Sequence, residues 1–135
     1  MLTKDNPAGV AAPVGAYSQV ARVDVGTGTL LFLSGQIALS DDGVLVGPGD
    51  MVAQATRVFE LIGALLEAHG ATFADVVNVR TFLTDMTMLP LYGQVRRAVF
   101  TGPPPTSTTV EVSRLFREGA LLEVEVVAAV PAGAS

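Results

Sequence analysis

The clearest pattern of hydrophobic and polar positions lies near the carboxyl terminus, where residues 121–130 read LLEVEVVAAV. Because successive side chains of a strand point to opposite faces, Glu123 and Glu125 share one face of a strand here. The other face carries Leu122, Val124, Val126, Ala128 and Val130. Two carboxylates on one face of an otherwise apolar strand are costly unless that face meets water, a partner or a ligand. This face is therefore the first candidate for a functional site.

Four further segments are rich in strand-forming residues, and turns containing glycine or proline separate them. They are residues 17–25, predicted as an edge strand; 29–37, predicted as a central strand; 75–83; and 106–112, predicted to pair with 121–130. Within 75–83 the alternation places Val77, Val79, Thr81 and Leu83 on one face. Prolines and glycines are dense in residues 1–15, which we expect to form an extended, irregular arm.

Two segments have the three- and four-residue periodicity of amphipathic helices. Asp50 can cap the first helix, and Gly70 can end it. Its apolar stripe is predicted to contain Val52, Ala55, Phe59, Ile62 and Leu66. The second helix is predicted to begin at Asp85 or Thr87 and to continue through Leu91, Val95 and Val99, with Pro90 in or just before its first turn.

The order of these elements is strand pair, helix, strand, helix, strand pair. It predicts an α+β fold in a single domain, residues 1–135, with one mixed sheet covered on one face by two helices. The other face of an apolar sheet then needs a cover of its own. Half of the residues are hydrophobic and 16% are charged, which indicates either that subunits bury apolar surface against one another or that Ala and Val are simply enriched.

Charge and composition disfavour several classes of function. The net charge of −5 repels phosphate backbones, so no nucleic-acid partner is expected. No cysteine is present and His69 is the single histidine, so neither a metal site nor another cofactor is predicted. His69 precedes Gly70 and is predicted as a surface residue at a helix end. The amino terminus lacks an apolar core and no apolar run has membrane length, so a cytoplasmic protein without membrane contact is expected.

Four stretches carry a family resemblance. They are residues 105–115 (PTSTTVEVSRL) followed by 122–128 (LEVEVVA), and, earlier in the chain, 12–19 (APVGAYSQ), 33–37 (LSGQI) and 54–59 (QATRVF). Taken in their order along the chain, these stretches resemble the Rid family, also called the YjgF family, over nearly the whole chain. The resemblance implies the YjgF fold, similar to chorismate mutase, and a homotrimer with a barrel-like core, outer helices and clefts between subunits. It also implies a small-molecule metabolite as ligand and, in the better-known members, deamination of enamines and imines.

The resemblance also assigns candidate site residues. Glu123 falls where the family has a carboxylate that manages protons, so it is the catalytic candidate. Tyr17, Ser34 and Gly35 fall on the family's Gly-Pro-Tyr and Ser-Gly-Gln elements and are candidates for substrate binding. Two structural alternatives stay open: Glu123 as a rim carboxylate paired across a subunit junction, and Tyr17 as an ordinary packed aromatic residue.

One position departs from the family pattern. Active deaminases carry an arginine two residues after the proline of the Pro-x-Arg-Ser segment, where it pairs with a substrate carboxylate, and this chain has Ser107 there. Ser107 is a substrate-binding candidate, but a serine can donate only one neutral hydrogen bond. Gly93 stands nearest to the position of an expected asparagine in the second helix. The cations that could replace the arginine are Arg80, Arg96, Arg97 and Arg114, and we expect all four to face solvent or to be ion-paired.

Two functions therefore stay open from the sequence. The first is hydrolysis of a reactive imine, enamine or related carbonyl-derived metabolite at a subunit interface, without dependence on a carboxylate anchored by arginine. The second is a non-catalytic trimer that binds a small ligand and acts as a sensor or accessory protein. Ribonuclease activity, attributed to some relatives, fits poorly with the acidic charge and the lack of a histidine pair.

Overall fold

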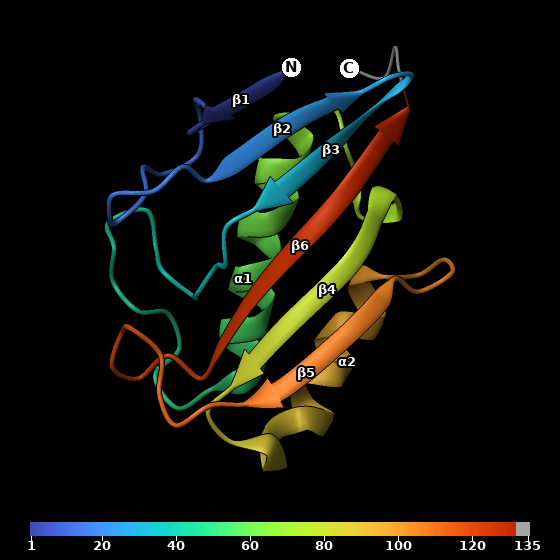
Figure 1. The fold of residues 1–135 in the computed structure, drawn as a ribbon. Coiled ribbons are helices and arrows are strands. Elements are labelled where there is room, and N and C mark those ends of the chain that lie inside the picture. The colour runs from blue at the N-terminus through green and yellow to red at the C-terminus, as the bar shows by residue number, and fades with distance from the viewer. Residues whose placement is uncertain (132–135) are drawn as a thin grey trace.

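The computed structural model describes residues 1–131, which form one six-stranded sheet with two helices packed on one face (Figure 1). The strands are β1 (Leu2–Asp5), β2 (Val20–Val25), β3 (Gly28–Leu33), β4 (Val76–Leu83), β5 (Thr106–Glu111) and β6 (Leu122–Pro131). The helices are α1 (Met51–Glu67) and α2 (Leu89–Val99), with short 3-10 turns η1 (Phe73–Asp75) and η2 (Met86–Met88). The strand order is β1-β2-β3-β6-β4-β5, in which β4 and β5 are parallel and the other neighbours antiparallel. The predicted α+β fold with one mixed sheet is thus confirmed.

The position of β5 differs from the predicted pairing of this strand with β6. β4 lies between the two: Arg80 of β4 is opposite Thr108 of β5 on one side and Glu125 of β6 on the other. The reason is α2, which connects β4 to β5 as a crossover and makes these strands parallel neighbours. β6 then returns antiparallel to β4, and Figure 1 shows it running through the middle of the sheet.

The amino-terminal arm is more regular than predicted, because β1 adds a strand to the outer side of β2. β2 is therefore not an edge strand, and it begins at Val20 instead of residue 17. The arm pairs with backbone groups that β2 would otherwise leave free along the edge of the sheet. After β1, the side chain of Asn6 accepts a hydrogen bond from the N–H of Gln19 (2.9 Å), which holds the arm near the start of β2.

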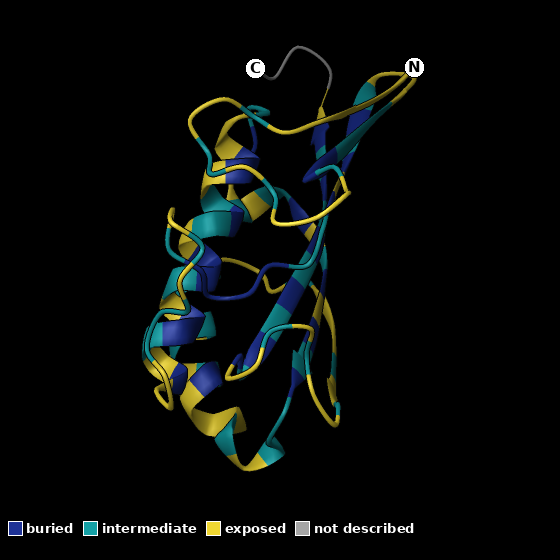
Figure 2. Ribbon diagram, turned by 90° about the vertical axis from the view of Figure 1, so that its left-hand side faces the viewer, coloured by how far each residue is buried: buried dark blue, intermediate teal, exposed yellow. Residues whose placement is uncertain are grey.

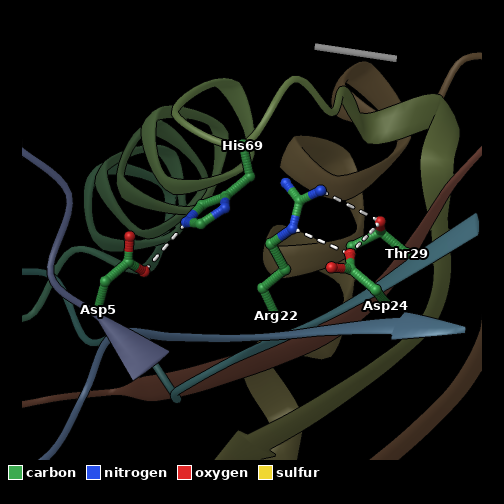
Figure 3. A network of polar contacts seen from close by, with 5 residues as sticks. All are labelled: Asp5, Arg22, Asp24, Thr29 and His69. Carbon is green, nitrogen blue, oxygen red and sulfur yellow. Dashed lines mark hydrogen bonds and ion pairs between the residues drawn. The ribbon is translucent and has the colours of Figure 1, made fainter. Parts of the chain in front are cut away.

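Polar contacts join β1 to the end of α1 and β2 to β3 (Figure 3). His69, predicted as a surface residue, points toward Asp5 of β1 with 3.1 Å between Nε2 and Oδ1, and its side chain is only 9% exposed. Beside this pair, Arg22 and Thr29 both contact Asp24 Oδ1, at 3.2 and 2.9 Å. The prediction for His69 was wrong because the arm folds back as β1 and covers the helix end.

The buried face of β4 departs from simple alternation. A β-bulge between Val76 and Asn78 shifts the register against β6, so Val76 is buried while Val77 is 47% exposed. Beyond the bulge, Val79, Thr81 and Leu83 are buried as predicted. The bulge turns one residue out of the row that faces the helices, which corrects the predicted position of Val77.

The helices begin close to the residues predicted for them. Asp50 accepts a hydrogen bond from the N–H of Ala53 (3.0 Å), and Gly70 follows α1 with a φ of 72°. α2 begins at Leu89, after Asp85 has capped η2. The buried apolar stripe of α1 contains Met51, Ala55, Val58, Phe59, Ile62, Leu65 and Leu66, whereas Val52, predicted in this stripe, is exposed. Neither helix is long and apolar enough to span a membrane.

The two faces of the sheet have different surroundings: Figure 2, a ribbon coloured by burial, shows both helices on one side of the sheet and none on the other. Toward the helices, the even-numbered residues of β6 from Leu122 to Val130 are buried, as the alternation predicts. The opposite face, here called the open face, carries Glu123 and Glu125. It also carries the apolar side chains of Leu30, Phe32, Phe82, Val110 and Val127, of which Phe32 is 44% exposed. Residues 1–131 of one chain therefore leave an apolar sheet face without a cover.

Candidate functional site

Glu123 lies on the open face of β6, beside the loop that follows β3. Gln36 in this loop exchanges two backbone hydrogen bonds with Val124, of 2.8 and 3.1 Å, although β3 itself ends at Leu33 and not at residue 37 as predicted. This pairing brings Gly35 against the Glu123 side chain. A Cβ atom at Gly35 would collide with the carboxylate, so the bare glycine backbone allows this approach. The structure thus brings together two of the predicted site residues.

The carboxyl group of Glu123 is half-buried, and its surroundings favour the protonated form. Burial raises the pKa of Glu123 above its usual value, and the charge of Glu125 raises it further. Arg80 on the neighbouring strand pairs with Glu125 instead, with 2.6 Å between Nε and Oε1. Within residues 1–131, Glu123 has no ion-pair partner. A carboxyl group with a raised pKa is suited to donate and accept protons closer to neutral pH.

A small pocket adjoins Gly35 on the side of the amino-terminal arm. Its walls come from residues 11–14, from Tyr17 and Gln19, from loop residues between 35 and 43, from Leu61 of α1 and from Phe116 of the β5–β6 loop. Its volume is about 60 Å³, enough for about two water molecules. Tyr17 is 41% exposed and so is not an ordinary core aromatic. Phe116, which is 65% exposed, was not predicted as part of a site, because two apolar residues, Leu115 and Phe116, in an otherwise polar loop give no signal of a site by themselves.

Ser34, next to Gly35, holds two segments of the chain together. Its hydroxyl donates to the carbonyl of Ser18 (2.7 Å), and its N–H donates to the carbonyl of Gln19 (3.0 Å). Because the hydroxyl proton is used within the protein, only the lone pairs of the Ser34 oxygen are free to accept a hydrogen bond from a ligand. Its role in substrate binding stays a prediction.

Ser107 lies away from Glu123, on the other face of the sheet. Ser107 is opposite Val79, which is buried toward the helices, whereas Glu123 is opposite Phe82 on the open face. β4 separates the two strands that carry them, and β5 is the edge strand. A single protomer therefore does not bring these two predicted site residues to one small ligand.

A guanidinium group from α2 lies at Ser107. Arg96 donates a hydrogen bond from Nη1 to the Ser107 hydroxyl oxygen (2.7 Å), and its guanidinium carbon lies 5.8 Å from the centre of the Phe100 ring. This contact differs from the expectation that Arg96 faces solvent or is ion-paired. Arg80 is ion-paired as expected, and Arg97 and Arg114 are exposed, also as expected. No sequence signal links Arg96 to Ser107, because their contact depends on the crossover from β4 through α2 to β5.

A buried pair of hydroxyl groups lies behind Arg96. Tyr92 of α2 is 1% exposed, and its hydroxyl lies 2.6 Å from that of Thr81 on β4. Burial raises the pKa of Tyr92, while the hydrogen bond with Thr81 and the nearby charge of Arg96 oppose this rise. The pair fixes α2 against the sheet at the level of Arg96.

Known proteins show the same fold and sequence pattern. The family model described as endoribonuclease L-PSP matches residues 8–130. Protein DfrA of Myxococcus xanthus is 44% identical over 115 residues, which cover 85% of this chain and 86% of that protein. The mouse protein named 2-iminobutanoate/2-iminopropanoate deaminase is 30% identical over 117 residues, covering 87% of this chain and 83% of that protein.

Solved structures agree with these sequence matches. The structure of YyfA from Yersinia pestis, described as a conserved Rid family protein, superposes with a TM-score of 0.85 at 31% identity and covers 96% of this chain and all of its own. RidA from an Antarctic Psychrobacter superposes with a TM-score of 0.81 at 31% identity, covering 93% of this chain and 98% of its own. With the family model spanning nearly the whole chain, the protein belongs to the Rid family.

Proposed function

We propose that the protein hydrolyses imines, and enamines after their conversion to imines, releasing ammonia and a carbonyl compound. The observation that carries this proposal is the half-buried carboxyl group of Glu123, with its raised pKa, against the bare backbone of Gly35. Relatives support the same chemistry: the mouse protein and a protein of Dermatophagoides farinae, 33% identical, are both named 2-iminobutanoate/2-iminopropanoate deaminase.

Glu123 is suited to move the protons of this reaction. The protonated Glu123 carboxyl group first gives its proton to the imine nitrogen; water then adds to the carbon of the resulting iminium, and the Glu123 carboxylate accepts the proton that this water loses, which gives a neutral carbinolamine. The same carboxyl group returns that proton to the nitrogen, the C–N bond breaks and ammonia leaves. As the C=O bond forms, the hydroxyl proton of the carbinolamine passes to the Glu123 carboxylate, which restores the protonated group for the next imine. A carboxyl group that is half-buried and has a raised pKa can take both roles in turn.

The pocket beside Gly35 is too small to enclose a metabolite without further walls. Its volume of about 60 Å³ holds only about two water molecules. We therefore place the substrate between this pocket, with Tyr17 as one wall, and a neighbouring subunit of a homotrimer. The uncovered open face supports the assembly, because three such faces turned toward one another bury their apolar side chains in a barrel-like core.

The decisive experiment measures hydrolysis of imines formed during the assay, with ammonia as the readout. Glu123→Gln removes the proton acceptor and is expected to lower kcat by about 100-fold or more. Gly35→Ala is expected to lower kcat as well, since its Cβ displaces the carboxylate, and to leave the fold intact, since the displaced group is the end of a flexible side chain. Glu67→Gln is the matched control, because it removes the same charge from an exposed position of α1, on the other side of the sheet from Glu123.

Full activity of Glu123→Gln would contradict the proposed role of this carboxyl group. Saturable binding of small neutral carbonyl compounds by the unmodified protein, with no ammonia released from any imine, would instead support the non-catalytic ligand-binding trimer.

A further inference from the structure

Phe116 is the most exposed aromatic residue within residues 1–131. The ring pairs in this part of the chain join Phe59, Phe73, Tyr92 and Phe100, and the ring of Phe116 belongs to none of them. A single exposed apolar residue is ordinary on a protein surface. Phe116 differs from such a residue in its place at the pocket beside Gly35 and in the way its loop is fixed.

Three exposed apolar side chains meet at this pocket. Val14 and Tyr17 reach it from the amino-terminal arm, and Phe116 reaches it from the β5–β6 loop near the other end of the chain. The interior, with a volume of about 60 Å³, holds only about two water molecules. A phenyl or branched group therefore lies at the mouth of the pocket, against these three side chains.

The residues on both sides of Phe116 are tied to the walls of the pocket. Leu115 packs against the small apolar cluster that contains Ile37, which is itself one of these walls. Arg117 donates a hydrogen bond from Nη2 to the carbonyl of Gly43 (3.0 Å), and Gly43 is another wall. The ring between these two contacts is left outside the core.

A buried side chain of α1 fixes the end of the same loop. Gln54 is fully buried; its Nε2 donates to the carbonyl of Gly119 (3.1 Å), and its Oε1 accepts from the N–H of Leu121 (2.8 Å). Gly119 has a φ of 86°, and a Cβ there would lie 2.8 Å from the Leu45 side chain, so the loop packs closely on its neighbours. A wall that is ordered in advance lowers the entropy cost of binding a ligand.

We infer that Phe116 recognises an apolar side chain of the imine and that Arg117 is a positioning residue that holds Phe116 at the pocket. The inference rests on the proposed imine hydrolysis and adds a specificity to it: Phe116 favours imines with an aromatic side chain relative to imines with a methyl group. The aromatic ring of the substrate lies between Phe116 and Tyr17, where the contact removes apolar area from water.

The first test compares two imines that differ only in a phenyl group. An amino acid oxidase forms them in the assay from alanine and phenylalanine, and semicarbazide traps free imine in competition with the protein. The fall in semicarbazone then measures kcat/KM. Phe116→Ala is expected to lower kcat/KM for the phenylalanine-derived imine by about 10-fold and to change the alanine-derived imine by less than about twofold.

Two further variants show whether the ring itself is responsible. Leu91→Ala is the matched control, because it truncates an exposed apolar side chain of α2 outside the pocket, and it should change neither imine by more than about twofold. Phe116→Leu keeps an apolar side chain without the ring and should recover part of the loss. An equal loss for both imines in Phe116→Ala, or no loss for either, would overturn the inference.

Variants of Arg117 test its positioning role. Arg117→Ala removes the hydrogen bond to Gly43 and is expected to lower kcat/KM for the phenylalanine-derived imine by about three- to tenfold, with little change for the alanine-derived imine. Arg117→Lys can still donate to this carbonyl and should restore most of the loss. An equal loss for both imines, or no recovery in Arg117→Lys, would overturn this role.

Calorimetry of product binding keeps the inference distinct from the proposed function. Pyruvate and phenylpyruvate are the carbonyl products of the two imines and differ in the same phenyl group. If no protein releases ammonia, the proposed hydrolysis fails, but Phe116→Ala should still bind phenylpyruvate about 10-fold more weakly than the unmodified protein and bind pyruvate equally well. Equal affinity of the two proteins for phenylpyruvate would overturn recognition by Phe116 even if hydrolysis were observed.

Sedimentation at the concentration of the assay separates recognition of a ligand from contact between subunits. The Phe116→Ala protein is expected to sediment as the unmodified protein does, because the ring faces the ligand. A smaller assembly in this variant would overturn the inference, since Phe116 would then belong to a subunit contact.

Discussion

The two faces of β6 differ although their residues alternate along one strand. Leu122 and Val124 on the helix side are fully buried, whereas Glu123 and Glu125 on the open face are only partly covered. The helix side is completed within one chain by α1 and α2. The open face combines apolar side chains with carboxylates, and nothing in the described part of the chain, residues 1–131, covers it. The helix-side face therefore forms the core of the single chain, whereas the open face carries the proposed site and the proposed contact between subunits.

The largest expected effect contrasts two adjacent leucines of β3. Leu31 faces the helices and is fully buried, whereas Leu30 lies on the open face and is half-buried. Leu31→Ala should lower the free energy of unfolding by about 3 kcal/mol, because it leaves a cavity in the core. Leu30→Ala should cost less than about 1 kcal/mol in the protomer but weaken its assembly. Urea unfolding at fixed protomer concentration and sedimentation measure the two effects; equal destabilisation of the protomer by both variants would contradict the contrast.

The next effect concerns the buried hydroxyl pair on the helix side. Thr81 is 1% exposed, and its hydroxyl oxygen lies 2.6 Å from the hydroxyl oxygen of Tyr92. Tyr92→Phe removes this partner and leaves the buried Thr81 hydroxyl without it. We expect the free energy of unfolding to fall by about 1–2 kcal/mol. The double variant Tyr92→Phe/Thr81→Val should recover part of this loss, because no buried hydroxyl is then unpaired. If the double variant loses more free energy of unfolding than the two single variants together, packing and not the hydrogen bond dominates.

The next prediction concerns how Glu123, on the open face, makes the free energy of unfolding depend on pH. Because the pKa of Glu123 is raised above 4.5 in the folded protein, the folded state binds this proton more tightly than the unfolded state. Stability should therefore fall as pH rises from 4.5 through the raised pKa. Glu123→Gln lacks this dependence and should be more stable than the unmodified protein at neutral pH, by less than about 1 kcal/mol since the group is only half-buried. Parallel unfolding curves from pH 4 to 8 measure the difference, which should vanish at the acidic end.

The smallest effect is expected for the ion pair between Arg80 and Glu125. The side chain of Arg80 is 58% exposed, so water screens the pair, and Arg80→Ala should change the free energy of unfolding by at most about 0.5 kcal/mol. Thermal unfolding at low and high salt is the appropriate measurement. A loss well above 1 kcal/mol that disappears at high protein dilution would indicate that a neighbouring subunit covers this pair.

Local patterns alone were enough to predict a large part of the fold. The alternation along β6, the stripe and cap of α1, and the order of strands and helices depend on neighbours within a few residues, and the structure agrees with them. The closeness of Gly35 to Glu123 was implied by the family motifs, and the structure supplies its cause in the backbone pairing of Gln36 with Val124.

The tertiary structure decided the features that depend on contacts between distant segments. The β4–α2–β5 crossover set β4 between β5 and β6, a bulge turned Val77 outward, and the folded arm covered His69. The same crossover brought Arg96 to Ser107, 11 residues away, a contact that no local pattern in the sequence indicates. The physical reason is that periodicity reports which face a side chain occupies, whereas strand order and long-range packing determine what that face meets.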